Sequence, residues 1–235
     1  MTPFFVGWSV RGATPLMGFL APVLAALLLG FAALAFALGV TVDDPGGGDF
    51  AGDMDITGFL LADPYPMIVT DRGHTVPLSG GGKRGVQAEA RPLDGQRVRA
   101  TGTGVRRGDR DLLLVDALRP ASGEATPPAR EPLGAWRLTG EICDGKCVAG
   151  VMRPGRGAAH KACANVCLLG GVPPVLVTTT PVLGTRYVMM GGPDDHALPD
   201  AFRDHVAVLR RMDGTLERIG DALLFRTDVT RAAAP

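Results

Sequence analysis

The sequence lacks a net charge, because 24 lysines and arginines balance 24 aspartates and glutamates over 235 residues. A chain without excess positive charge has no general electrostatic attraction to nucleic acid. Aromatic residues are also scarce, at 6% of the chain. Non-specific binding of single strands uses aromatic side chains on which bases stack, and the first strand-rich region has only Phe59 and Tyr65. We therefore expect no nucleic-acid partner.

Several cofactor and catalytic motifs are absent as well. The sequence has no Cys-x2-Cys-His for covalent haem and no Rieske or ferredoxin spacing. Ser79–Arg84 (Ser-Gly-Gly-Gly-Lys-Arg) lacks the second fixed glycine and the Ser/Thr of a phosphate-binding loop, so we interpret it as a hairpin turn. Because no acid–base or cofactor motif converges, we expect no enzymatic activity.

Charged side chains are missing altogether from Gly12 to Val42. A helix of about 20 apolar residues spans the hydrocarbon core of a bilayer, so residues 17–42 are predicted to form a transmembrane helix. The alternative is a cleaved signal peptide, but this apolar run is longer than the roughly 7–15 residues of a secretory core. The lipid bilayer is therefore an expected partner.

The flanking charges predict the orientation of this helix. Arg11 precedes it, whereas five aspartates follow it: Asp43, Asp44, Asp49, Asp53 and Asp55. The positive flank of a membrane helix stays in the cytoplasm. We expect a bacterial cytoplasmic (inner) membrane protein with its N-terminus in the cytoplasm and its bulk in the periplasm. The aromatic residues Phe4, Phe5 and Trp8 would then anchor at the inner interface or contact a partner subunit.

The remainder of the chain is predicted to be rich in short strands. It contains most of the 33 glycines and 19 prolines, which favour tight turns. Two segments share one pattern, the first opening with Ile56-Thr-Gly58 and the second with Leu138-Thr-Gly140. About five apolar-alternating runs per copy suit a small closed barrel, which has no free edges. The predicted fold class is mainly β, with one N-terminal transmembrane helix followed by two small OB-like β-barrels in tandem.

This pattern predicts the following segments: 1–16 (cytoplasmic N-terminus), 17–42 (transmembrane helix), 43–54 (linker), 55–118 (first barrel), 119–135 (Pro-rich linker), 136–229 (second barrel, with a Cys-rich insertion at 143–174) and 230–235 (tail). The first barrel has a basic face made of Arg97, Arg99, Arg106, Arg107 and Arg110. We interpret this face as a solvated surface or a protein contact.

All four cysteines lie in the predicted insertion, as two Cys-x3-Cys pairs: Cys143, Cys147, Cys163 and Cys167. In an oxidising compartment disulfides form and persist, and a bond within one helical Cys-x3-Cys would be strained. The two pairs are therefore predicted to bridge each other, either as Cys143–Cys163 with Cys147–Cys167 or as Cys143–Cys167 with Cys147–Cys163. Each bridge would close a loop of about 20 residues and contribute about 3 kcal/mol.

A metal site is the alternative for the same residues. Four thiolates, or three with a histidine, would bind zinc tetrahedrally, and the candidate ligands are Cys143, Cys147, His160, Cys163 and Cys167. A nucleophilic thiol is disfavoured because the cysteines occur as matched pairs. Under the disulfide interpretation no cofactor is expected and His160 makes a hydrogen bond. Under the alternative the cofactor is zinc.

The span 143–174 contains Lys-Cys, Met-x-Pro-Gly, His-x2-Cys-Ala-x2-Cys and Gly-Gly-x-Pro-Pro, and Phe-Val-Gly-Trp precedes the apolar helix. In these elements the chain resembles an uncharacterised bacterial family of single-pass, membrane-anchored proteins with no established activity. The resemblance implies association with membrane-bound oxidoreductases and electron-transfer assemblies.

These observations lead to two functional hypotheses. The first is a non-catalytic accessory subunit that braces a larger respiratory or photosynthetic membrane complex, with the other subunits as partners. The alternative is a metal-binding (zinc or iron) or thiol-redox module that serves a membrane oxidoreductase. The state of the four cysteines discriminates between them.

Overall fold

The computed structural model describes residues 14–41 and 47–235. The chain divides into two compact units, Met1–Asp44 and Pro45–Pro235, which we describe separately. The predicted contact residues Phe4, Phe5 and Trp8 lie outside the described residues.

The helix α1 (Thr14–Thr41) is the described part of the first unit. Its central stretch, Met17–Val40, has a mean hydropathy of 2.6 and no buried side chains within the chain. A helix that is apolar on all sides needs an apolar environment. The predicted apolar N-terminal helix is therefore confirmed. By length and composition it can cross a bilayer or act as a signal sequence.

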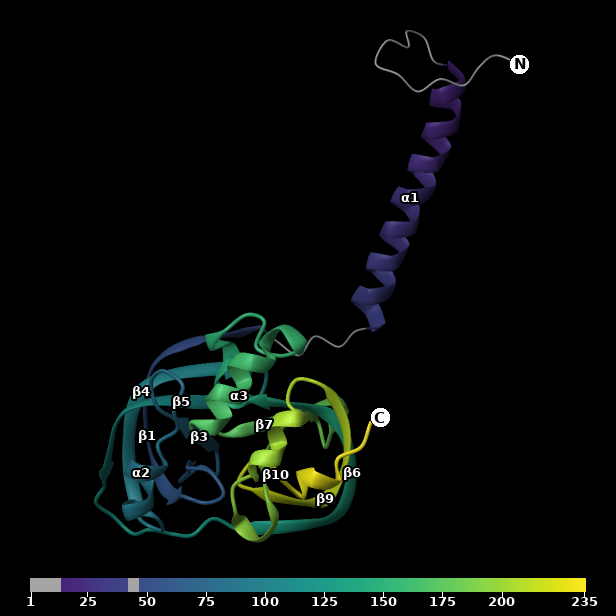
Figure 1. Ribbon diagram of the computed structural model, residues 1–235. Coiled ribbons are helices and arrows are strands. Elements are labelled where there is room, and N and C mark those ends of the chain that lie inside the picture. Colours follow the sequence, from purple (N-terminus) through teal and green to yellow (C-terminus); the bar gives the residue numbers. More distant parts are fainter. Residues whose placement is uncertain (1–13, 42–46) are drawn as a thin grey trace. The chain divides into compact units, whose positions relative to one another are not determined.

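The second unit contains two closed β-barrels of five strands each (Figure 1). The first consists of β1 (Gly48–Leu61), β2 (Met67–Thr70), β3 (Thr75–Ser79), β4 (Arg97–Arg107) and β5 (Arg110–Pro120). The second consists of β6 (Arg130–Asp144), β7 (Pro174–Val182), β8 (Thr185–Gly191), β9 (Leu209–Ile219) and β10 (Ala222–Thr227). The prediction of a mainly β protein with two barrels is confirmed.

Both barrels have the same strand order. The first closes as β1-β2-β3-β5-β4 and the second as β6-β7-β8-β10-β9. In each, the third and fifth strands are parallel, whereas the other neighbours are antiparallel. The short helices are α2 (Gln87–Ala90), η1 (Arg91–Leu93), η2 (Cys147–Val151), η3 (Ala158–His160), α3 (Lys161–Leu169), η4 (Pro193–Asp195), η5 (Asp200–Asp204) and η6 (Val229–Arg231).

The repeated Thr-Gly dipeptide has a structural cause. A Cβ atom at Gly58 would clash with the carbonyl oxygen of Val69 on β2. In the second barrel, a Cβ atom at Gly140 would lie 2.6 Å from the carbonyl oxygen of Val177 on β7. Each glycine therefore permits a close approach between the first two strands of its barrel.

The first strand of each barrel is longer than expected. β1 begins at Gly48, inside the predicted linker 43–54, because its N-terminal half pairs with β4 as far as Arg107. β6 begins at Arg130, inside the predicted linker 119–135, because it pairs with β9 as far as Ile219.

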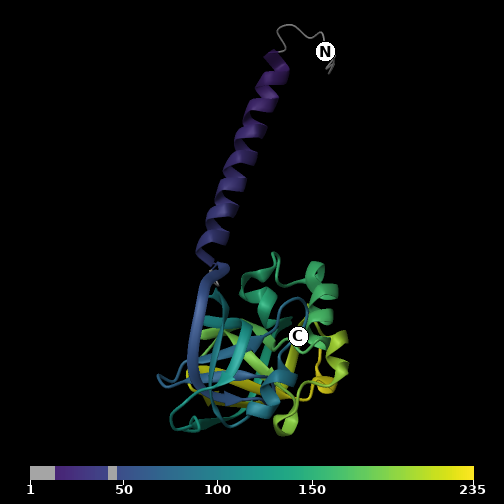
Figure 2. The ribbon, with the colours of Figure 1, turned by 90° about the vertical axis from the view of Figure 1, so that its left-hand side faces the viewer.

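Each barrel has its own apolar core, and a third cluster joins the two. The largest fully buried side chains include Leu60, Ile68, Leu78 and Leu113 in the first barrel and Ile142, Leu176, Met190 and Phe225 in the second. The joining cluster contains Met67, Val69, Met189, Ile219, Ala222 and Leu224. The two barrels thus pack side by side, and the first lies in front of the second in the view of Figure 2. Their relative position is stabilised by burial of this apolar surface.

A histidine links the two barrels beside this apolar contact. His74, between β2 and β3, has its Nδ1 atom 2.6 Å from Asp221 of the β9–β10 turn. Its Nε2 atom lies 3.0 Å from Asp111 of β5. Burial by itself lowers the pKa of His74, but the hydrogen bonds to both carboxylates outweigh it and raise the pKa above 6.5. Burial by itself raises the pKa values of Asp111 and Asp221. Their hydrogen bonds have the larger effect, so both pKa values lie below 3.8.

This bridge predicts a pH-dependent contribution to stability. A raised folded-state pKa makes the His74 contribution complete below pH 6.5, and the contribution is lost as the pH rises through that pKa. The lowered pKa values of Asp111 and Asp221 make their contribution complete above pH 3.8, and it is lost as the pH falls through them. We expect His74→Gln to reduce the free energy of unfolding by about 1 kcal/mol or less, since His74 and Asp221 are partly exposed to solvent.

Urea unfolding of the wild type and His74→Gln at a series of pH values measures this contribution. The difference should be largest between pH 3.8 and 6.5 and should shrink above the raised pKa of His74. His196→Gln, at an exposed position, is the control. A difference that does not change with pH would contradict the bridge.

Candidate functional site

Three of the four cysteines, Cys147, Cys163 and Cys167, lie on the cysteine segment, residues 145–173, which connects β6 to β7, the first two strands of the second barrel. Cys143 lies on β6 itself. Cys147 begins the irregular turn Cys147–Val151. Cys163 and Cys167 lie on α3, four residues apart and therefore on the same face of the helix. The predicted insertion 143–174 therefore includes the last two residues of β6 and the first residue of β7, and the connection itself is residues 145–173.

Three of the four sulfur atoms form a cluster. The Sγ atoms of Cys147, Cys163 and Cys167 all lie within 4.8 Å of one another. Cys147 and Cys167 are buried against Val172, whereas Cys163 is partly exposed. Two separate chain segments thus bring three thiols together at a point that solvent reaches from one side.

The fourth cysteine is outside this cluster. Cys143 is the penultimate residue of β6, and the side chains of a strand alternate between its two faces. Ile142 packs in the core of the barrel, so Cys143 lies on the other face, among residues that include Val148 and Tyr187. Its thiol donates a hydrogen bond to Glu141 Oε1 at 3.3 Å.

The predicted disulfides are therefore wrong. All four cysteines, which the structure describes completely, are free. Both predicted cross-pairings required Cys143 to meet a cysteine of α3, and the alternation of β6 directs its side chain elsewhere. The predicted metal set is likewise divided, because Cys143 does not join Cys147, Cys163 and Cys167.

A buried polar pair supports the turn that carries Cys147. Asp144 Oδ1 accepts the backbone N–H of Cys147 at 2.8 Å. Asp144 Oδ2 lies 2.9 Å from Nε2 of His160, and these side chains are 0% and 2% exposed. His160 thus makes a hydrogen bond, as predicted. The ligand atoms of Asp144, Cys147 and His160 also lie within 4.8 Å of one another, so this pair adjoins the thiol cluster through Cys147.

The first barrel contributes a cation that the sequence analysis missed. Gly80–Gly85, previously interpreted as part of a hairpin turn, instead connects β3 to α2 and lies against the cysteine segment. In this loop, Nζ of Lys83 is 2.7 Å from Cys163 Sγ and 4.0 Å from Cys167 Sγ. The hydrogen bond to Cys163 raises the pKa of Lys83, so its side chain is charged. No local sequence signal joins Lys83 to cysteines 80 residues away.

The cluster favours a thiolate at Cys167. The Cys147 thiol donates a hydrogen bond to the Cys167 sulfur, and with the charges of Lys83 and Lys146 this lowers the pKa of Cys167 to about 7, against the effect of burial. The same hydrogen bond, together with burial, raises the pKa of the donor Cys147. Burial and Glu141 raise the pKa of Cys143. Low pKa and an adjacent cation are features of thiols that react or bind metal.

The arginines of the predicted basic face have partners within the chain. Arg97 forms two hydrogen bonds with Asp71, at 2.5 and 2.7 Å. Arg99 and Arg106 form ion pairs with Asp55 and Asp111, and Arg107 donates to the carbonyl oxygen of Val148. Their role as a partner contact stays a prediction.

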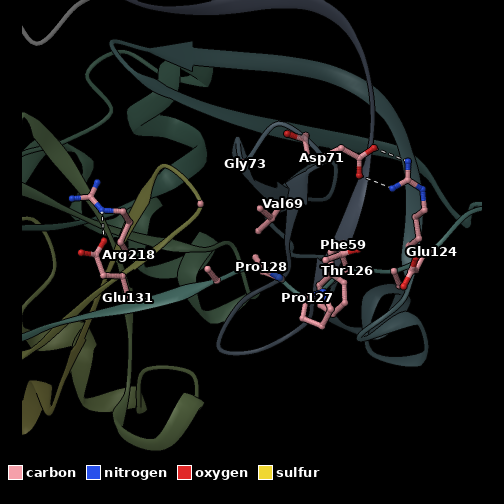
Figure 3. Close-up of a pocket in the computed structure, with 15 residues that line it drawn as sticks. Phe59, Val69, Asp71, Gly73, Glu124, Thr126, Pro127, Pro128, Glu131 and Arg218 are labelled. Carbon is pink, nitrogen blue, oxygen red and sulfur yellow. Dashed lines mark hydrogen bonds and ion pairs between the residues drawn. The ribbon is translucent and has the colours of Figure 1, made fainter.

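A cleft of about 500 Å³ lies beside the connection between the barrels (Figure 3). Its walls include Phe59, Val69 and the connecting residues 124–129. Two arginines line it, and both have partners: Arg97 pairs with Asp71, and Arg218 Nε lies 3.1 Å from Glu131 Oε2. Figure 3 labels Arg218 and Glu131 and marks their interaction with a dashed line. Since these charges are neutralised by partners in the chain, the thiol cluster is the stronger candidate site.

Comparison with known proteins found no matching family model, curated protein or solved structure. The resemblance of residues 143–174 to an uncharacterised membrane-anchored family therefore stays a prediction. The function is argued below from the geometry of the cluster.

The arrangement predicts distinct reactivities for the four thiols. In denaturant, four thiols should react with a thiol reagent without prior reduction, because all four cysteines are free. In the folded protein Cys163 should react first, since it is the partly exposed one. Mass spectrometry of the labelled protein identifies the site. Cys163→Ser should remove the fastest phase of the labelling reaction, and Cys143→Ser should leave that phase unchanged. A count of two reactive thiols in denaturant, or labelling of Cys143 before the others, would contradict the structure.

Proposed function

We propose that this chain is a membrane-anchored protein that binds one thiophilic metal ion, with zinc as the first candidate, through Cys147, Cys163 and Cys167. The observation that supports this is the group of three sulfur atoms within 4.8 Å of one another. Thiolates at about 2.3 Å from a zinc ion lie about 4 Å apart, so only a small contraction is needed. Soft thiolate ligands select zinc, monovalent copper or iron–sulfur clusters.

Side chains around the three cysteines also favour metal binding. The hydrogen bond from Cys147, together with the charges of Lys83 and Lys146, lowers the pKa of Cys167, and a thiolate is the form that binds metal. The buried Asp144 holds the backbone of Cys147 in place, which preorganises one ligand. The chain supplies three of the four ligands of a tetrahedral zinc ion, and Cys163 is partly exposed. The fourth coordination position would therefore be open to water or another ligand, as in catalytic zinc sites.

We further propose that both barrels are OB-like and stand in tandem. The shared strand order, closed by a parallel pair of third and fifth strands, supports this assignment. In this interpretation the second barrel differs from the first by the insertion between its first two strands, and the insertion carries the site.

The localisation that we propose is the bacterial inner membrane, with residues 1–16 in the cytoplasm and the barrels in the periplasm. The apolar stretch Met17–Val40 and the aspartates that follow α1 support it. In that oxidising compartment unprotected thiols form disulfides, so bound metal would preserve the three thiols.

Fusion of alkaline phosphatase after Pro235 tests this orientation. The enzyme folds only where its disulfides form, so the fusion should be active, and a green fluorescent protein fusion at the same position should be dark. The fused chain should also remain in the membrane fraction after a carbonate wash. The reverse pattern, or release of the fusion from the membrane, would contradict the proposed topology.

The alternative function is a non-catalytic accessory subunit of a respiratory or photosynthetic complex. Val166 and Leu169, which lie one turn apart on α3, are 50% and 49% exposed, and this observation favours a protein contact at the insertion. The two functions are compatible if the metal site serves an oxidoreductase that docks there.

Metal analysis of the purified full chain tests the proposed function. Protein kept in detergent without chelator should contain one zinc ion per chain. Cys147→Ser, Cys163→Ser and Cys167→Ser should each weaken zinc binding by at least about 100-fold, because each removes a ligand. Cys143→Ser is the matched control and should bind like the wild type. A metal-free wild type that also takes up no added Zn²⁺ would reject the metal site and leave the accessory subunit.

A further inference from the structure

The loop of the first barrel that carries Lys83 fits closely against the cysteine segment of the second. The backbone N–H of Gly85 donates to the carbonyl oxygen of Gly170 at 2.7 Å. A Cβ atom at Gly170 would clash with the carbonyl oxygen of Lys83. Glycine at position 170 therefore allows the two backbones to approach directly, and this approach fixes the place of Lys83.

The cysteine segment holds this loop from its own side as well. Lys146 lies one residue before Cys147 and is 3% exposed. Its Nζ donates to the carbonyl oxygen of Gly80 at 3.0 Å and also to that of Gly82. Gln87 Nε2 donates to the carbonyl oxygen of Gly171 at 2.6 Å. Three hydrogen bonds thus position the loop Gly80–Gly85, and a fourth, from Gln87, holds the start of α2 just after it; none involves the side chain of Lys83.

The charge of Lys83 suits a metal–thiolate centre. Three thiolates and one divalent ion carry a net charge of −1, and the ammonium group 2.7 Å from Cys163 Sγ cancels it. Hydrogen bonds from such a cation to a coordinated sulfur also stabilise the thiolate form. Because Lys83 is exposed to solvent, keeping it charged has little desolvation cost.

We propose that Lys83 is a positioning residue of the metal site and that metal binding therefore strengthens the contact between the two barrels. The inference rests on the proposed function, since it concerns the same three thiols. Three ligands come from the second barrel and the neutralising cation comes from the first. Coupling between two binding events is reciprocal. The free energy by which the first barrel strengthens metal binding is therefore equal to the free energy by which the bound metal stabilises the contact between the two barrels.

Zinc competition with a chromophoric chelator, on the full chain in detergent, measures the contribution of Lys83 to affinity. Lys83→Gln should weaken Zn²⁺ binding by about 10-fold or more, and Lys83→Arg should recover most of the loss because it restores the charge. Arg84→Gln is the matched control. It removes the same charge from the next residue, whose guanidinium lies 3.6 Å from Glu89, and it should bind zinc like the wild type.

Hydrogen exchange of the loop amides measures whether metal binding strengthens the contact between the barrels. If Lys83 affected only the metal affinity, the exchange rates of the loop at saturating Zn²⁺ would be the same in the wild type and in Lys83→Gln. In the wild type, Zn²⁺ should slow exchange of the loop amides, that of Gly85 in particular. In Lys83→Gln at saturating Zn²⁺ this protection should be reduced, although the metal is bound.

The two proposals fail in distinguishable ways. If the wild type binds no Zn²⁺, the proposed function is rejected. If the wild type and Lys83→Gln bind Zn²⁺ equally well with equal protection of the loop, the metal site stands and the role of Lys83 is rejected.

Discussion

The apolar contact between the two barrels is the interaction on which the candidate site depends. Met67 and Val69 of the first barrel pack with Met189 and Leu224 of the second. Burial of apolar surface is non-directional, so this cluster alone does not specify one orientation. Polar contacts supply the specificity: His74 bridges Asp111 and Asp221 on one side, and the Gly80–Gly85 loop meets the cysteine segment on another. The position of Lys83 beside the thiols follows from this packing.

Much of the fold could be predicted from the sequence, because its causes are local. The apolar run that forms α1 is visible in composition, and the repeated Thr-Gly dipeptide marks the same close strand approach in both barrels. Alternating apolar residues identified the strands. The ends of β1 and β6 were less predictable, because their outer halves are strands only by virtue of pairing with β4 and β9.

The site was predicted in location but not in composition. Cys143 was expected to pair with α3, although the alternation of β6 already placed it opposite the core residue Ile142. The alternation of side chains along a strand is visible in the sequence. The symmetric spacing of the two Cys-x3-Cys pairs nevertheless favoured a disulfide pairing that includes Cys143. The place of Lys83 beside the thiols could not be predicted in this way, because it depends on how the two barrels pack against each other. Long-range contacts of this kind have no periodicity or spacing in the sequence.

The three clustered cysteines lie in the connection between β6 and β7 and not in the strands of the second barrel. Residues 145–173 lie between two strands that are adjacent in the barrel, and the corresponding connection in the first barrel, 62–66, is short. The shared architecture therefore does not require the long connection. A chain built in this way can acquire, alter or lose reactive side chains in one connection while the strands on either side of it stay unchanged, so the candidate site can change in evolution while the barrel is retained.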